Sequence, residues 1–539
     1  MKKVFKILET PFHPVLFTLF PVLSLFAVNI KELPISEIKF PLTIILLVII
    51  IFWSLLNFVF PDKKLTAIIT SLTALFLFSY QPLVGSFLSS EIFFQLIRIF
   101  RRLGNINGAY WFTSGIAVLG LIYFLQKSKK HLTEFTIMFN IAALFITIWP
   151  LFTVTTTEII RKTRIVKQPV QISAISNKPT EELPDIYYII VDAYANQHTL
   201  QDYYNFDNSD FVNFLKQTGF YVAQYSKSNY PLTYDSVPSS LNMDYLDELI
   251  KQVGKDSTDV LPLQEFAQDN RLILYLKAKG YKYYNFGPKN HFFQIKKNVD
   301  FNFTYFSGEQ KSLVKLSAFT ELFISQTLLK PLIDSNIISL KTTGIQEAGL
   351  NDNRSYYNEI LNQIDSVPKI APQSGPKFVF VHSLLTHPPF VFNQEGNFVS
   401  NSNWTTDYRK GYIDQLIFAN QALQKLIGLI LQGSPKPPVI VLQSDHGSYP
   451  PGLQKEGYNF YWPAASKDEL KERFGILNAY YFPDKDTNSL YETITPVNSF
   501  RIILNKYFGE KLKLLPDRSF VPSNFHHPYD VTDVTDLIK

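Results

Sequence analysis

Long apolar runs fill about the first 155 residues, whereas the rest of the chain mixes apolar and polar positions as globular proteins do. A helix of about 20 apolar residues is long enough to cross a bilayer. The pattern predicts about five such helices, over residues 11–30, 40–60, 66–88, 110–126 and 134–154. No small-residue cleavage site follows the first run, so we interpret it as a retained anchor and not a signal peptide. The sequence therefore predicts a transmembrane domain over residues 1–154.

Basic residues flank these runs on both sides, so the positive-inside rule does not decide their orientation. Five crossings from a cytoplasmic N-terminus would place the C-terminal domain outside. Residues 89–103 combine apolar positions at helical spacing with three arginines, which favours an amphipathic helix in the headgroup region. A solvated loop helix explains the same pattern nearly as well. Residues 155–183 are rich in Thr, then basic, then contain Pro and Glu, and are predicted to be a linker.

From Pro184 onward, strand-like and helix-like segments alternate, which is typical of an α/β domain with a mainly parallel sheet and helices on both faces. We expect this domain to cover residues 184–510, with residues 511–539 as a C-terminal tail. The expected strands are 186–191, 281–286, 377–381, 439–443 and 478–482, and the expected helices are 208–218, 262–278, 405–431 and 496–507.

Three of the predicted strands end in polar residues. Asp192 follows the first strand, His382 ends the third, and Asp445-His446-Gly447 closely follows the fourth. Ligands of open α/β sheets bind at the carboxyl ends of the strands. Carboxylate oxygen and imidazole nitrogen together suit Zn²⁺ or Mn²⁺, so we predict a metal site at Asp445, His446 and Asp192. The chain has no cysteine, which excludes thiolate ligands, disulfides and a cysteine nucleophile.

A hydroxyl-rich segment, NYPLTYDSVPSSLN, contains the candidate nucleophile. Thr233 stands where a helix can begin. It fits a plain N-cap, because Thr is favoured there. It equally fits a metal-activated hydroxyl at a helix N-terminus, and periodicity does not separate the two interpretations. Ser236 is the second candidate nucleophile.

Histidines in VHSLLTHPPF are candidates for contacting substrate. His387, which precedes two prolines in an expected exposed loop, is the better candidate for protonating a leaving group. His382 is the weaker substrate contact and fits a structural role at the strand end. Lys289 and His291, after the strand at 281–286, form a candidate anion-binding pair.

Four motifs in order, DIYYIIVDAY, NYPLTYDSVPSSLN, FVFVHSLLTHPPF and VIVLQSDHG, resemble the alkaline phosphatase/sulfatase superfamily over roughly residues 184–510. In particular they resemble its membrane-anchored branch of lipoteichoic acid synthases and lipid A phosphoethanolamine transferases. The resemblance implies that Asp192, Asp445 and His446 are metal ligands and that Thr233 is the metal-bound nucleophile. It also implies that His387 faces the substrate.

The function implied by this resemblance is a metal-dependent phospho-transferase of the cell (inner) membrane with an extracytoplasmic catalytic domain. It would move a phosphoglycerol or phosphoethanolamine head group from a membrane lipid to a surface glycan or lipid, through phosphorylated Thr233. One Mn²⁺ or Zn²⁺ is expected, with Mg²⁺ as a third option. The alternatives are a sulfatase-like phosphoric or sulfuric ester hydrolase and a catalytically inactive membrane-anchored binding protein. Nucleic acid is not an expected partner, because the net charge is only +5 and no basic stripe is present.

Two departures from the family pattern narrow these expectations. The segment SYPPGLQKEGYNFYW, after the Asp-His pair, lacks the further histidine that phosphoethanolamine transferases carry, which argues against a second metal ion. Residues 236–240 imitate the start of a sulfatase signature, but Ser240 stands in place of its arginine. Sulfate-ester hydrolysis is therefore disfavoured.

Overall fold

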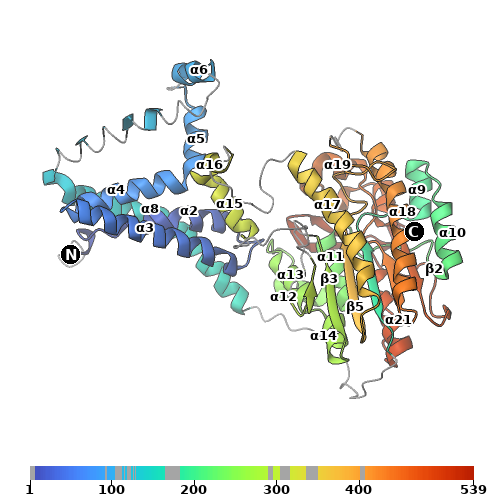
Figure 1. The fold of residues 1–539 in the computed structure, drawn as a ribbon. Coiled ribbons are helices and arrows are strands. Elements are labelled where there is room, and N and C mark those ends of the chain that lie inside the picture. Colours follow the sequence, from blue (N-terminus) through green and yellow to red (C-terminus); the bar gives the residue numbers. More distant parts are fainter. Residues whose placement is uncertain are drawn as a thin grey trace. The chain divides into compact units, whose positions relative to one another are not determined.

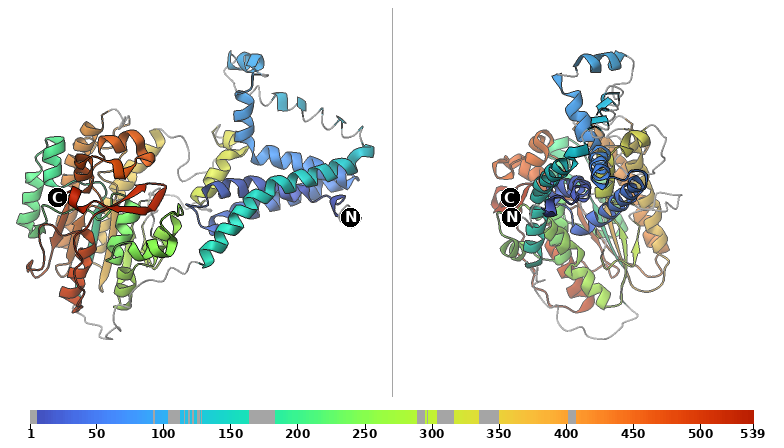
Figure 2. Two further views of the ribbon diagram at one scale, coloured as in Figure 1. Left: turned by 180° about the vertical axis from the view of Figure 1, so that it is seen from behind. Right: turned by 90° about the vertical axis from the view of Figure 1, so that its left-hand side faces the viewer.

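The computed structural model describes residues 6–91, 94–102, 129–163, 183–288, 295, 297–303, 316–334, 350–400 and 407–539, with isolated residues between 112 and 127. The chain divides into two compact units. A helical unit comprises residues 1–165 and 311–346, and an α/β unit comprises residues 166–310 and 347–539. Figures 1 and 2 show the helices and strands of each unit.

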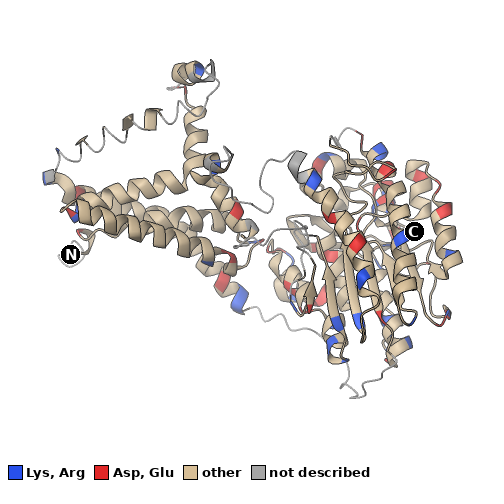
Figure 3. Ribbon diagram, in the orientation of Figure 1, with Lys and Arg blue, Asp and Glu red and all other residues tan. Residues whose placement is uncertain are grey.

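The helical unit contains four apolar helices that run side by side (Figure 1). These are α2 (His13–Asn29), α3 (Lys39–Val59), α4 (Lys63–Phe78) and α8 (Leu132–Thr163). The short helix α5 (Tyr80–Leu88) follows α4 and turns away from it. Val22 and Phe26 of α2 pack with Ile45 of α3 and Val154 of α8 in one buried cluster. Charged residues are confined mainly to the helix ends (Figure 3), as expected for segments surrounded by lipid.

Two described helical segments, Ile35–Val59 and Leu132–Thr163, are long and apolar enough to cross a membrane. The pair α4 and α5 would make a third if it is one span, but it bends by 75° after Phe78. Helix α2 is apolar but has only 17 residues, and most of residues 110–126 lie outside the described part. The predicted count of about five crossings is therefore not confirmed. Within the expected interfacial segment, α6 (Phe94–Arg102) is helical.

A later part of the chain belongs to the helical unit. Helices α15 (Ala318–Gln326) and α16 (Leu329–Asp334) lie between strands β4 and β5 in sequence. Phe319 and Phe323 are buried in the same cluster as Phe26, and the rings of Phe26 and Phe319 are 5.5 Å apart. The amide of Leu328 donates to the carbonyl of Leu77 at 2.8 Å. The chain thus returns to the apolar helices partway through the sequence of the α/β unit.

The α/β unit contains a seven-stranded sheet in the order β2-β7-β6-β1-β5-β3-β4. Its strands are β1 (Ile186–Val191), β2 (Phe220–Val222), β3 (Lys282–Phe286), β4 (Phe301–Asn302), β5 (Lys377–Ser383), β6 (Val439–Gln443) and β7 (Asn478–Tyr481). Strand β7 is antiparallel to both of its neighbours, and the other neighbouring pairs are parallel. The expectation of a mainly parallel sheet is confirmed, with β7 making it mixed.

The central strand β1 is buried along its whole length, which explains its unbroken apolar sequence. Ile186, Tyr188 and Ile190 face one core, whereas alternate residues of the strand face the other. Helices α11 (Thr233–Asn242), α13 (Leu261–Gln268), α14 (Arg271–Ala278) and α21 (Pro496–Phe508) contribute to the first core. Helices α10 (Ser209–Thr218), α17 (Leu350–Ser366) and α18 (Tyr408–Gly433) contribute to the second. The predicted helices on both faces are confirmed.

Residues 520–533 form an antiparallel hairpin of β8 (Phe520–Asn524) and β9 (His527–Asp533). Phe520 and Tyr529 are buried in the first core. The amide of Phe520 donates to the carbonyl of Asn229 at 2.9 Å, and the Asn229 side chain donates to the carbonyl of Arg518 at 2.8 Å. This C-terminal segment therefore supports the loop that leads into α11.

Candidate functional site

The candidate site lies where three neighbouring strands end. Strand β1 pairs in parallel with β5 on one side and β6 on the other. Ile190 is in register with both His382 and Gln443. The residues that follow therefore leave the sheet at the same edge, which brings Asp192, Asp445 and His446 together although they are far apart in sequence.

Asp192, Asp445 and His446 form a buried cluster with the spacing of metal ligands. Their ligand atoms all lie within 4.8 Å of one another. His446 Nε2 is 3.4 Å from Asp192 Oδ1 and 3.6 Å from Asp445 Oδ2. Both oxygens of Asp445, and Oδ1 of Asp192, lack a well-formed hydrogen bond within the described part of the chain. Buried carboxylates without partners are costly, so these residues fit a divalent cation.

The orientation of His446 suits this role. Its Nδ1 is 3.0 Å from the carbonyl of Gly447, which favours the tautomer that donates from Nδ1 and leaves the Nε2 lone pair toward the carboxylates. Gly447 is required at this place because a Cβ would lie 2.4 Å from the carbonyl oxygen of Glu472. Only glycine lets the loop approach that backbone so closely.

Thr233 is the first residue of α11, and its buried hydroxyl lies among the candidate ligand atoms. Its Oγ1 is 3.3 Å from His446 Nε2 and 3.5 Å from Asp192 Oδ2. The N-cap position belongs to Leu232, and no side chain caps this helix. The hydroxyl of Ser236 donates to the carbonyl of Asp445 at 2.7 Å. Of the two candidate nucleophiles, Thr233 is the one beside the metal-ligand atoms, while Ser236 supports the ligand loop.

The two carboxyl groups have opposite electrostatic environments. Burial alone would raise the pKa of Asp192, but the nearby imidazoles, chiefly those of His387 and His446, hold that pKa well below its usual value. Burial, followed by the negative charge of Asp192, raises the pKa of Asp445 to about 7. Burial and the positive charge of Arg473 lower the pKa of His446 well below its usual value. Neutral His446 and a carboxyl group that ionises when a cation binds are what a metal site needs.

His382 and His387 have different surroundings. His382 is buried, and its Nε2 is 3.1 Å from Asp192 Oδ2. Burial opposes a charge on His382, but the hydrogen bond and charge of Asp192 raise its pKa, so His382 supports Asp192. His387 is partly buried, and its Nε2 is 2.7 Å from the hydroxyl of Tyr449. Lys289 and His291 lie outside the described residues.

Two residues of this site, Tyr449 and Arg473, were not among the predicted ones. Arg473 belongs to α20 (Lys467–Phe474) and is 1% exposed. It donates to the carbonyls of Pro231 at 2.7 Å and Gly447 at 3.0 Å, and its guanidinium lies 4.4 Å from the ring centre of Tyr449. The sequence contains no signal for this role, because a basic residue in the last turn of a helix is common.

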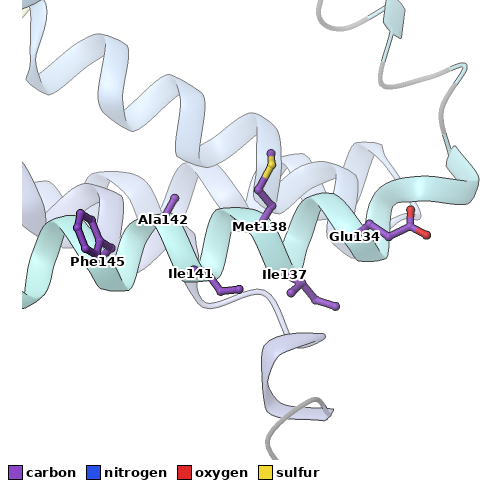
Figure 4. Close-up of a pocket in the computed structure, with 6 residues that line it drawn as sticks. All are labelled: Glu134, Ile137, Met138, Ile141, Ala142 and Phe145. Atoms are coloured by element: carbon purple, nitrogen blue, oxygen red, sulfur yellow. The ribbon is translucent and has the colours of Figure 1, made fainter.

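An apolar hollow of about 570 Å³ lies elsewhere, along α8 in the helical unit. Figure 4 shows its lining residues, which are Glu134, Ile137, Met138, Ile141, Ala142 and Phe145. None of the candidate site residues lines this hollow.

The part of the chain that holds this site matches a known family. Residues 184–498 match the family described as Sulfatase. The chain is similar to the C-terminal periplasmic domain of EptC from Escherichia coli, with 14% identity over 66% of this chain and 94% of that chain and a TM-score of 0.40. It is also similar to the integral membrane protein lipooligosaccharide phosphoethanolamine transferase A (EptA) from Neisseria meningitidis, with 12% identity over 92% of this chain and 95% of that chain and a TM-score of 0.37.

A third similar structure is the phosphonate monoester hydrolase of Agrobacterium radiobacter, with 12% identity over 63% of this chain and 80% of that chain and a TM-score of 0.37. No curated protein matches the sequence. The family match covers more than half of the chain and includes every described candidate site residue.

Proposed function

The chain belongs to the sulfatase family of the alkaline phosphatase superfamily of enzymes, and from this premise we propose that it is a metal-dependent phospho-transferase. It moves a phospholipid-derived head group, of the phosphoglycerol or phosphoethanolamine type, to a cell-surface glycan or lipid. The observation that carries the proposal is the position of the Thr233 hydroxyl, 3.3 Å from His446 Nε2 and 3.5 Å from Asp192 Oδ2 at the start of α11.

Asp192, Asp445 and His446, with the hydroxyl of Thr233, are the residues that would hold one divalent ion. Their oxygen and imidazole donors suit Mn²⁺ or Zn²⁺, with Mg²⁺ as a third option. When bound, the ion lowers the pKa of a coordinated hydroxyl and offsets negative charge on phosphoryl oxygens.

The protein's own residues account for both halves of the transfer. Thr233 Oγ1 forms a bond to phosphorus and its proton passes to neutral His387, while the bond from phosphorus to the lipid oxygen breaks and the departing oxygen takes that proton from His387. Thr233 then carries the phosphorylated head group. In the second half, the acceptor hydroxyl gives a proton to His387, its oxygen bonds to phosphorus, the bond to Thr233 Oγ1 breaks, and Oγ1 takes the proton back from His387.

The alternative of sulfate-ester hydrolysis has less support. A sulfatase needs a modified cysteine or serine as its nucleophile, but this chain has no cysteine. The hydroxyl of Ser236 is committed to the carbonyl of Asp445.

Phosphoric ester hydrolysis uses the same residues as transfer, with water in place of the acceptor hydroxyl. The long apolar helices favour transfer from a membrane lipid, because they keep the enzyme where its donor is. We place the protein in the cell (inner) membrane with an extracytoplasmic catalytic domain.

Full-length protein in vesicles that contain phosphatidylglycerol or phosphatidylethanolamine tests the proposal. We expect release of diacylglycerol and, by mass spectrometry, a head-group phosphate on the peptide that contains Thr233. Thr233→Ala should abolish both, and Thr233→Ser should retain part of the activity. Added glycan or lipid acceptor should raise turnover and receive the head group. Undiminished diacylglycerol release by Thr233→Ala would overturn the proposal.

A further inference from the structure

We propose that Tyr458, together with the end of the β8–β9 hairpin, binds a sugar ring of the acceptor next to the candidate active site. This inference deepens the proposed function and rests on it, because it assigns the class of acceptor and the residues that bind it. Tyr458 belongs to the segment after the Asp-His pair, residues 448–462, which lacks the further histidine of phosphoethanolamine transferases. That segment carries exposed tyrosines instead.

A row of aromatic rings leads from the residue after the nucleophile to the surface. Tyr234, which directly follows Thr233, is buried, and its hydroxyl donates to the carbonyl of Phe525 at 3.1 Å. The rings of Tyr234 and Phe525 meet edge to face, with centres 5.0 Å apart at 86°. The ring of Phe525 lies 4.3 Å from that of Tyr458, at 36°. Because Tyr458 is 68% exposed, the outer end of this row is open to solvent.

Tyr458 is also close enough to the site to act on it electrostatically. Burial raises the pKa of Tyr449, and the electrostatic effects of Asp445 and Tyr458 add to this increase. The ring of Tyr449 lies 6.0 Å from that of His446. Tyr458 therefore lies on the side of the α/β unit that carries the candidate metal ligands.

The backbone that carries Tyr458 is held in place by buried neighbours. Helix α19 (Pro451–Glu456) ends at Gly457, whose φ of +56° and ψ of −130° suit glycine. Phe460 and Trp462 are buried in one cluster, with ring centres 4.9 Å apart at 90°. The exposed ring is therefore attached to a segment anchored by two buried rings, which lowers the entropy cost of binding a ligand.

The chemistry of this surface fits a sugar. A sugar ring has a face of C–H groups, which stacks on an aromatic ring, and a rim of hydroxyls, which needs polar partners. Tyr458 offers the open ring. The hairpin end offers a polar group, because the imidazole of His526 is exposed and its ring lies 5.6 Å from that of Phe525. The proposed donor head groups contain no ring, so an aromatic face here fits the acceptor and not the donor.

The experiment gives the full-length protein two acceptors at once, methyl glucoside and glycerol, in vesicles that contain phosphatidylglycerol and phosphatidylethanolamine. Both acceptors have hydroxyls, but only the glucoside has a ring face. Mass spectrometry gives the ratio of the two head-group products, which does not depend on how much of the enzyme is folded. Wild type should favour the glucoside. Tyr458→Ala should lower the ratio of glucoside to glycerol product by about 2- to 10-fold, the range expected for one stacking contact.

Two further variants separate ring stacking from other effects. Tyr458→Phe keeps the ring and loses only the hydroxyl, so it should keep the wild-type product ratio. Tyr225→Ala is the matched control, because it removes a tyrosine that is 54% exposed and stacks on the ring of His198. It should also leave the product ratio unchanged.

An unchanged ratio with Tyr458→Ala, or an equal fall with Tyr458→Phe, would overturn the inference. A wild type that does not favour the glucoside would do the same. A rise in KM for the lipid donor with Tyr458→Ala, at an unchanged product ratio, would show that the ring contacts the lipid instead. Failure of the proposed function gives a different result: wild type would then load no head group onto Thr233 even without an acceptor, and the inference would fall with it.

Discussion

The hydroxyl of Thr233 lies 3.3 Å from Nε2 of His446, although 213 residues separate them in the chain. This proximity arises because α11 begins at the edge of the sheet where β1 and β6 end. The same edge holds Asp192 and Asp445, whose carboxyl groups are buried and lack hydrogen bonds at three of their four oxygens within the described residues. A hydroxyl placed among such atoms is suited to nucleophilic attack once a cation is present.

Metal binding is the first property to measure. Purified full-length protein should contain roughly one divalent ion per chain, and Asp445→Ala should lose it, because a carboxylate ligand is removed. Chelation should lower the melting temperature of wild type, and Mn²⁺ or Zn²⁺ should restore it. Asp202→Ala, at an exposed aspartate in the same unit, is the control and should keep its metal. Wild type that is folded but binds no ion would contradict the site.

Asp445 should make the metal-free protein less stable as pH rises. Burial and the charge of Asp192 raise its pKa to about 7, against about 3.9 for an unfolded chain. Between these values the folded chain holds a proton that the unfolded chain has released, so the contribution of this group to the free energy of unfolding falls with increasing pH. The loss is at most about 4 kcal/mol and is complete above about pH 7.

Asp445→Asn removes this titration. In the presence of a chelator, the melting temperature of the variant minus that of wild type should therefore increase between about pH 5 and about pH 8. A difference that does not change with pH would show that the Asp445 carboxyl is not desolvated as described.

Gly447→Ala should be destabilising, because its Cβ would lie 2.4 Å from the Glu472 carbonyl and 2.9 Å from the Arg473 carbonyl. Backbone atoms cannot yield as side chains do, so we expect a loss of about 1–3 kcal/mol in the free energy of unfolding, together with weaker metal binding. Gly428→Ala, within the C-terminal part of α18 and with no atom within 4 Å of the new Cβ, should instead be stabilising by about 0.5–1 kcal/mol. Chemical denaturation of both variants tests this contrast.

The return of the chain to the apolar helices can be tested by a disulfide. The hydrogen bond of 2.8 Å between Leu328 N and Leu77 O brings the two backbones into contact, and a disulfide needs its two Cα atoms within about 7 Å of each other. The absence of native cysteines makes Leu77→Cys/Leu328→Cys a clean pair. Mild oxidation should give a faster-migrating band on non-reducing gels. Each single variant should give none, and a double variant that stays reduced would contradict this packing.

The candidate site could be predicted from the sequence because its residues directly follow predicted strands. Asp192 and the Asp445-His446 pair each follow a wholly buried run, so their convergence at one edge follows from a parallel sheet. The reverse direction of β7 could not be predicted, since alternation and apolarity are the same in either direction. The roles of Arg473 and Tyr449 could not be predicted, because they depend on how α20 packs against the ligand loop. The burial of Phe319 and Phe323 in the helical unit could not be predicted either, because an apolar residue does not indicate which core it enters.

The contacts of the C-terminal segment with the loop before Thr233 also determine when that loop can be stabilised during synthesis of the chain. Asn229 donates to the carbonyl of Arg518, 289 positions later in the chain, and accepts from the amide of Phe520. Because a ribosome makes the chain from its N-terminus, every candidate ligand emerges before this brace exists. A nascent chain thus holds all the components of the site before it holds their final arrangement, and the nucleophile loop is secured only after Arg518 and Phe520 have been added.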